Sequence, residues 1–221
     1  MLTYTIKDIL NNIDKIQAGD SLLVNDKRNI FQAPTAFIIK IATEGPFNHV
    51  GMLSFKEGKL NIVEADTKDG VIETSIDKYD RDFIEVLILR PLQLKDGKRY
   101  TKANGQSSVE RARTKIGLKY DFFGLLGFGF EVFGNAIIKK IFKKWNPTHW
   151  RNRFFCSELV VESYREANVD VCKGTTPSSA SPNDIFRDLT NGMKLVTLDD
   201  NEEMVKMYKE NRYEMLKSIK K

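Results

Sequence analysis

Two apolar runs joined by one short polar turn constrain the fold of this chain more than any other feature. They cover residues 50–55 and 60–65, and Lys56-Glu57-Gly58-Lys59 separates them. Short apolar runs bounded by turn residues predict β-strands, and so short a connection joins neighbouring antiparallel strands. Two more strands are expected over 70–75 and 83–89. The sequence therefore predicts a small antiparallel sheet, either open or curled into a barrel.

This hairpin brings a histidine and a glutamate together. If the turn is centred between Lys56 and Glu57, His49 lies directly opposite Glu64, and if it is centred on Glu57-Gly58 the two become diagonal neighbours. Either register leaves the two side chains within reach on one face of the sheet. A carboxylate beside an imidazole fixes its tautomer and stabilises the imidazolium. The alternative, which the pair alone supports equally well, is a histidine at a strand edge and a solvated glutamate.

A cysteine stands where two aromatic residues give way to a helical pattern. Apolar or small residues recur every three or four positions after Cys156, and Ser157 and Glu158 fall in the first turn. An unperturbed thiol is only about 3 % thiolate at neutral pH, and a helix N-terminus contributes roughly 0.3–1 kcal/mol. A reactive Cys156 therefore needs a nearby imidazole. Taken alone, the residue is better explained as a small buried hydrophobe.

Two helices are expected around these strands. Pro34 suits a helix start, and Phe37, Ile38 and Ile41 have the spacing of a buried stripe. A second helix is predicted to start at Ser107 or Ser108, after a polar connector over 92–106.

The segment 122–145 is apolar and then basic. Four glycines and a glutamate within 122–138 make it a poor membrane-spanning helix. Four lysines follow on one helical face, while Trp145 lies on the apolar face. This pattern suits a membrane surface, an acidic partner or the substrate site, although an ordinary surface helix explains it slightly better. The four lysines are Lys139, Lys140, Lys143 and Lys144.

Composition narrows the function classes. The net charge of +5 suits an acidic partner or a membrane surface, but no nucleic-acid module is visible. Two cysteines in no metal-like spacing and two histidines predict neither a metal site nor another cofactor. Residues 1–8 do not form a signal peptide, so a cytoplasmic location is the default. We expect a single domain over 1–221, with an insertion at 122–145 and a charged helical tail at 201–221; its oligomeric state is not indicated.

Taken together, the order and spacing of these motifs resemble the permuted papain-like amidases of the NlpC superfamily, the YaeF/YiiX-like group. The resemblance spans roughly residues 17–190, and the strand with the histidine precedes the helix with the cysteine. Its motifs are Ala18-Gly19-Asp20, Asn48-His49-Val50-Gly51-Met52, Val63-Glu64-Ala65, Leu89-Arg90-Pro91, Gly117-Leu118-Lys119-Tyr120-Asp121, Phe155-Cys156-Ser157-Glu158-Leu159-Val160 and Ser181-Pro182-Asn183-Asp184.

The resemblance implies an α+β, circularly permuted papain-like fold and a cysteine amidase or peptidase. Cys156 would be the nucleophile, His49 the base, Glu64 the group that orients His49, and Tyr120 an aid to oxyanion or substrate positioning. The expected substrate is a peptide-like amide or an acyl lipid, since related enzymes move lipid acyl chains. The other alternative is a non-catalytic ligand-binding module in which the cysteine is structural. His149, seven residues before Cys156, is a rival base, which we discount because it would need a tight reversal of the chain.

Overall fold

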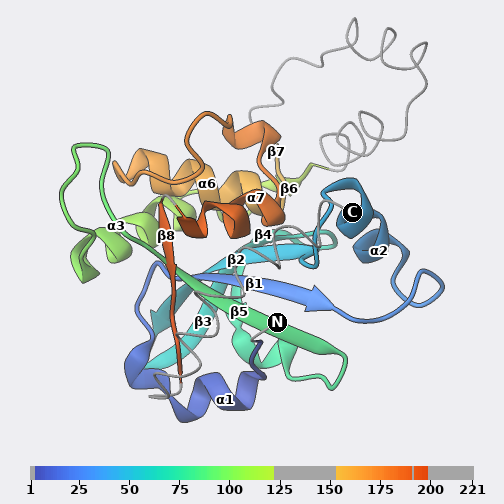
Figure 1. The fold of residues 1–221 in the computed structure, drawn as a ribbon. Coiled ribbons are helices and arrows are strands. Elements are labelled where there is room, and N and C mark those ends of the chain that lie inside the picture. Colours follow the sequence, from blue (N-terminus) through green and yellow to red (C-terminus); the bar gives the residue numbers. More distant parts are fainter. Residues whose placement is uncertain (1–2, 122–152, 191, 199–221) are drawn as a thin grey trace, which may run out of the picture.

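A six-stranded antiparallel sheet forms the centre of the molecule (Figure 1). The computed structural model describes residues 3–121, 153–190 and 192–198. The strand order is β4-β3-β2-β1-β5-β8. Because β4 and β8 are edge strands, pairing among the described residues does not close the sheet into a barrel. The strands are β1 (Ser21–Asp26), β2 (His49–Lys56), β3 (Lys59–Asp66), β4 (Gly70–Ser75), β5 (Ile84–Pro91) and β8 (Met193–Leu195).

Helices cover both faces of the sheet (Figure 1). On one side lie α3 (Lys102–Arg113), α6 (Cys156–Glu166) and α7 (Pro182–Arg187), and on the other lies α1 (Ile6–Asn11). Helix α2 (Pro34–Ala42) stands beside the sheet and leads into β2. A short parallel pair, β6 (Lys119–Tyr120) with β7 (Arg153–Phe154), precedes α6. The remaining elements are the 3₁₀ turns η1 (Ile13–Lys15), η2 (Ile76–Tyr79), η3 (Pro177–Ser179) and η4 (Asp188–Thr190).

Alternate residues of the central strands enter two separate cores. Leu23, Met52 and Leu87 pack with α3 and α6, whereas the neighbouring residues Leu22 and Leu53 pack with α1 on the opposite face. A strand that is buried on both faces needs apolar residues at every position. This explains why the strands form continuous apolar runs.

The hairpin adopts the second of the two predicted registers. Lys56 pairs with Lys59 and Met52 with Val63, so the turn is centred on Glu57-Gly58. Both turn residues have positive φ, 52° and 74°, as the two-residue turns that match strand twist require. His49 and Glu64 are therefore diagonal neighbours.

The structure corrects the predicted buried stripe of α2. Ile39 and Ala42 face the core, while Ile38 is 49 % and Ile41 45 % exposed. The helix carries apolar residues on more than one face, so periodicity could not decide which face is buried.

The start of α3 was also predicted wrongly. The helix begins at Lys102, where Thr101 and Asn104 form a reciprocal capping box. Gly105 lies against the chain at Ala18, because an added Cβ would meet the Ala18 carbonyl oxygen at 2.0 Å.

Within the described part of the chain, no helix is both long and apolar enough to cross a bilayer.

Candidate active site

Cys156 is the first residue of α6, and its side chain is buried. The residue is 3 % exposed, and Phe155 precedes it in an extended conformation. The carboxylate of Glu158 accepts a hydrogen bond from the backbone of Phe155 and thus caps the helix. Backbone groups of Val50 and Ser157 hydrogen-bond to the Cys156 sulfur. Strand β2 and the start of α6 therefore meet at this thiol.

His49 begins β2 and lies between Glu64 and Cys156. Its Nε2 is 2.5 Å from the Oε2 atom of Glu64, and its ring also hydrogen-bonds to the side chain of Cys156. The Glu64 side chain is completely buried, whereas that of His49 remains 17 % exposed. The structure thus brings together the three residues that the sequence had selected.

The charges of these groups reinforce one another. Burial disfavours the imidazolium, but charge interaction and hydrogen bonding with Cys156, and then with Glu64, outweigh it and raise the pKa of His49 to about 10. Burial likewise disfavours the thiolate, yet the charge and hydrogen bond of His49 lower the pKa of Cys156 below its usual value. The geometry therefore favours a thiolate–imidazolium pair over a neutral thiol and imidazole.

Two residues of η2 that the sequence analysis did not identify complete the surroundings of Glu64. The Nζ atom of Lys78 is 2.5 Å from Oε1 of Glu64 and 3.1 Å from Oδ2 of Asp66. The hydroxyl of Tyr79 donates to Oε2 of Glu64, the same atom that contacts His49. Although burial opposes ionisation of Glu64, His49 and Lys78 together hold the pKa of this carboxyl below its usual range. No periodic signal marks these donors, since η2 is a four-residue turn.

Tyr120, predicted to aid oxyanion or substrate positioning, interacts with the charge of Cys156. It pairs with Phe154 between β6 and β7, and it is 6 % exposed in an apolar cluster with Phe155. Burial, and then the nearby charge of Cys156, raise the pKa of Tyr120 above its ordinary value. A neutral phenol beside the sulfur is thus the stable form.

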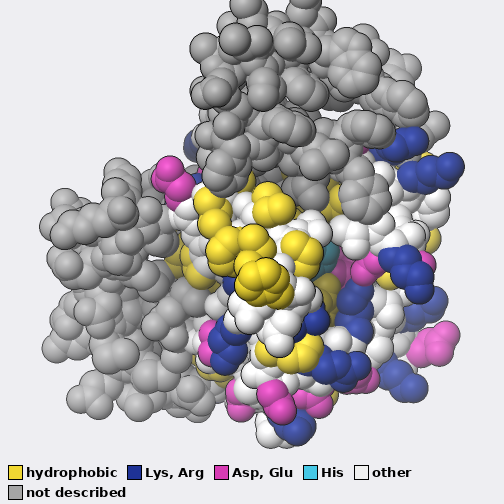
Figure 2. Space-filling view, turned by 90° about the vertical axis from the view of Figure 1, so that its right-hand side faces the viewer, with side chains coloured by type: hydrophobic (Ala, Val, Ile, Leu, Met, Phe, Trp, Pro, Cys, Tyr) yellow, Lys and Arg dark blue, Asp and Glu magenta, His cyan; other side chains and the backbone are white. Residues whose placement is uncertain are grey.

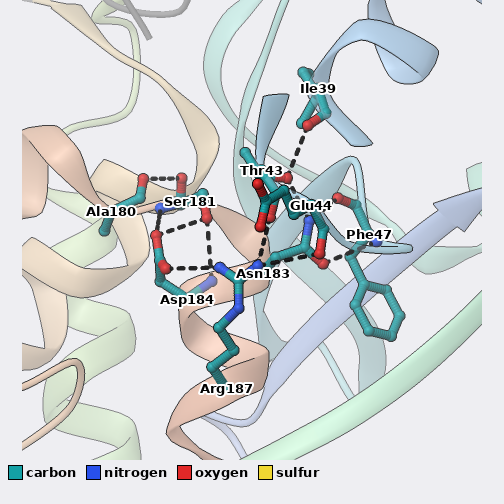
Figure 3. A network of polar contacts seen from close by, with 10 residues as sticks. Ile39, Thr43, Glu44, Phe47, Ala180, Ser181, Asn183, Asp184 and Arg187 are labelled. Carbon is teal, nitrogen blue, oxygen red and sulfur yellow. Dashed lines mark hydrogen bonds and ion pairs between the residues drawn. The ribbon is translucent and has the colours of Figure 1, made fainter. Parts of the chain in front are cut away.

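The loop that leads into His49 is fixed by a buried asparagine (Figure 3). Asn183 of α7 accepts a hydrogen bond from the Phe47 backbone N–H at 3.1 Å and donates to its carbonyl at 2.8 Å. The same amide donates to the hydroxyl of Thr43 at 2.5 Å. Gly45 leaves the necessary room, since a Cβ there would lie 2.3 Å from Asn183. These bonds hold the backbone two residues before His49.

The segment around α7 also contacts the helix with the cysteine. The hydroxyl of Ser157 donates to the carbonyl of Ala180 at 2.7 Å. Ser181 and Asp184 then form a reciprocal capping box that starts α7 (Figure 3). The motif Ser181-Pro182-Asn183-Asp184 thus connects the two halves of the site.

The second cysteine provides an internal contrast. Cys172 is also buried, but no imidazole is among the groups that shift its pKa, and burial together with Asp188 raises that pKa to about 12. It therefore remains a neutral thiol at physiological pH.

The other predicted contacts, namely Lys139, Lys140, Lys143, Lys144 and Trp145, lie outside the described residues, as does the rival base His149. Within the described ranges, no group of three or more His, Cys, Asp or Glu side chains is arranged to hold a metal ion.

Comparison with known proteins supports the fold. Neither a protein-family model nor a curated protein matches the sequence. Among solved structures, the metalloprotein YiiX of Escherichia coli O157:H7 is similar, with a TM-score of 0.54 and 17 % sequence identity. The similarity covers 83 % of this chain and 97 % of YiiX. The chain therefore has a mixed α+β fold like that of YiiX.

Proposed function

We propose that this chain is a cysteine-dependent hydrolase, an amidase or peptidase with a permuted papain-like arrangement, in which Cys156, His49 and Glu64 act as nucleophile, base and orienting carboxylate. The observation that carries the proposal is the position of the His49 ring between a buried carboxylate and a buried thiol. Since Nε2 contacts Glu64, Nδ1 is the ring nitrogen available to the sulfur. This arrangement generates a thiolate without an external base.

The reaction follows from these positions. The Cys156 thiolate attacks the substrate carbonyl carbon and forms a C–S bond, while the carbonyl electrons move onto oxygen. Backbone N–H groups at the start of α6, with Tyr120 nearby, stabilise this oxyanion. His49 then gives its proton to the leaving nitrogen or oxygen as that bond breaks, which leaves a thioester. His49 then takes a proton from water, whose oxygen attacks the thioester carbonyl carbon. The C–S bond breaks, the carboxylic acid product leaves, and the thiolate–imidazolium pair is restored.

Glu64 is suited to orienting His49 rather than to binding a metal. Lys78, His49 and Tyr79 already contact its two oxygens. Although the name of YiiX describes a metalloprotein, these contacts leave Glu64 no free oxygen for a metal ion. No step of the proposed mechanism passes through a metal.

The proposal is tested by the pH dependence of iodoacetamide alkylation at Cys156. We expect the wild-type thiol to react well below pH 8, and at neutral pH at least about tenfold faster than in His49→Ala, because only thiolate reacts. Cys172→Ala serves as the matched control and should leave the rate unchanged. Alkylation no faster than that of a free cysteine, or unaffected by His49→Ala, would overturn the assignment and favour a non-catalytic module. If alkylation is fast, amide substrates and acyl lipids would then be compared in wild type and Cys156→Ser.

A further inference from the structure

We propose that the outward face of α2, with the turn before it, is a surface that docks on an anionic lipid bilayer. Four of the eight exposed large hydrophobic residues in the described chain fall within residues 30–41. They are Ile30, Phe31, Ile38 and Ile41, with exposed fractions of 42, 93, 49 and 45 %. We call these four residues the α2 apolar surface.

The outward face of this helix is apolar where a surface helix is normally polar. Ile38 and Ile41 lie three residues apart on the solvent side, while Ile39 and Ala42 face the core. The helix has one charged residue, Lys40, and its ammonium group is turned back onto β1. It donates there to the side chain of Asn25 at 3.0 Å and to the carbonyl of Asp26. Water therefore meets mainly hydrocarbon on this face of α2.

Phe31 is presented by an ordered turn. The Asn29 side chain accepts hydrogen bonds from the backbone N–H groups of Phe31 and Gln32, at 3.1 and 3.2 Å. The backbone N–H of Ala33 donates to the Asn29 carbonyl at 2.9 Å. The turn thus holds a fully projecting aromatic ring beside the start of the helix.

Its shape and charge favour a bilayer over a protein partner. A projecting aromatic side chain and a short helix with outward isoleucines form a convex feature, which a fluid lipid surface accepts without a matching pocket. Lys27 and Arg28 flank this surface with side chains that stay 47 and 38 % exposed while they pair with Glu85 and Asp26. The chain as a whole carries a charge of +5. Apolar residues with basic neighbours are the pattern of interfacial helices that bind anionic lipids.

The surface is close to the candidate active site along the chain. Figure 2 shows hydrophobic side chains gathered on the face that carries α2, with basic and acidic side chains beside them. His49 is the one histidine in the described part of the chain, and only the loop over residues 43–48 separates it from α2. A bilayer bound here would lie beside the element that leads into His49. The docking surface stands without the proposed hydrolase, and only the implied substrate class, an acyl lipid, rests on that function.

The test is co-sedimentation of the full chain with vesicles made of equal parts phosphatidylcholine and phosphatidylglycerol. We expect the wild type to bind, and the triple variant Phe31→Ser/Ile38→Ser/Ile41→Ser to bind at least about tenfold more weakly, because it loses the apolar contact. The matched control is Leu10→Ser/Leu92→Ser/Ile116→Ser, which removes three residues that are 40, 40 and 45 % exposed elsewhere. This control should bind like the wild type.

Several outcomes would overturn the docking surface. The first is a wild type that does not bind, and the second is an α2 triple variant that binds as strongly as the wild type. The third is a control triple variant that loses as much binding as the α2 triple variant. A dimer seen by light scattering, and lost only in the α2 variant, would mean that a second copy of the chain covers this surface.

Alkylation of Cys156 without vesicles separates the docking surface from the proposed function. Equal rates of Cys156 alkylation in the wild type, the α2 triple variant and the control triple variant show that the site is intact in each. Slow alkylation in all of them, with vesicle binding retained, would refute the hydrolase but support the surface. If the substrate is an acyl lipid, the wild type should release fatty acid from the vesicles and Cys156→Ser should not. If the wild type cleaves soluble amides but releases no fatty acid, an acyl-lipid substrate is refuted.

Discussion

Replacing Glu64 by glutamine should lower the pKa of His49 without disturbing the fold. The surroundings of His49 raise its pKa from 6.5 to about 10, which corresponds to about 5 kcal/mol in favour of the imidazolium at 1.36 kcal/mol per pKa unit. Cys156 supplies the largest favourable contributions and Glu64 the next. An adjacent opposite charge shifts a pKa by roughly 1–3 units, so removing it should bring the pKa of His49 in Glu64→Gln from about 10 down to roughly 7–9.

The assay is a pH titration of imidazole nitrogen signals by NMR in protein labelled with ¹⁵N-histidine. The chain has two histidines, so His149→Gln assigns both signals. Cys156→Ala should lower the His49 pKa further than Glu64→Gln does, because the contribution of the thiolate is larger. Cys172→Ala should change nothing.

Lys78→Met should shift the pKa of His49 in the opposite direction to Glu64→Gln. It removes a positive charge from the other oxygen of Glu64, so Glu64 interacts more strongly with the imidazolium and the pKa of His49 should rise. A wild-type His49 that titrates near 6.5, or the same titration in Glu64→Gln and wild type, would refute the reasoning.

Two further predictions concern stability. His49, with its raised pKa, stabilises the fold fully below pH 6.5, and this contribution is lost towards pH 10. Cys156, with its lowered pKa, contributes fully above pH 9, and its contribution is lost as the pH falls through its folded pKa. The urea midpoint difference between wild type and His49→Ala/Cys156→Ala should therefore decrease between pH 9 and 10, where the contribution of His49 is still being lost and that of Cys156 is already complete, and a difference that does not decrease there would contradict the pairing. Asn183→Ala should lower the free energy of unfolding in urea by about 3 kcal/mol, because it leaves the buried Phe47 backbone groups without partners; a loss below about 1 kcal/mol would mean that the loop is held by other contacts.

The sequence predicted features that depend on local chemistry. The hairpin and the strands over 70–75 and 83–89 follow from short apolar runs bounded by turn residues, and the proximity of His49 to Glu64 follows from the hairpin. The start of α6 at Cys156 follows from the helical spacing of the residues after it. The choice between two hairpin registers needed the backbone, because only positive φ at both turn residues fixes the centre of the turn.

Features set by distant contacts were not predictable in this way. The buried face of α2 depends partly on Asn183, which is 140 positions from Thr43 in sequence, and its bond to the Thr43 hydroxyl. The start of α3 depends on a cap within a segment whose composition resembles a loop. Lys78 and Tyr79 reach Glu64 because η2 packs against β3, and no pattern in residues 76–79 indicates this.

The ionisable groups of the site form a line of alternating charge. The directions of the pKa values favour a positive Lys78, a negative Glu64, a positive His49 and a negative Cys156. An isolated buried charge costs several kcal/mol, so the charges of Glu64, His49 and Cys156 depend on their neighbours. Buried ion pairs can often be replaced by apolar residues with no loss of stability, or even a gain. A site that needed only to pack would therefore gain little from these ionised groups, whereas the proposed nucleophile, which must be a thiolate at neutral pH, depends on a charged His49 and on the carboxylate of Glu64 that keeps His49 charged.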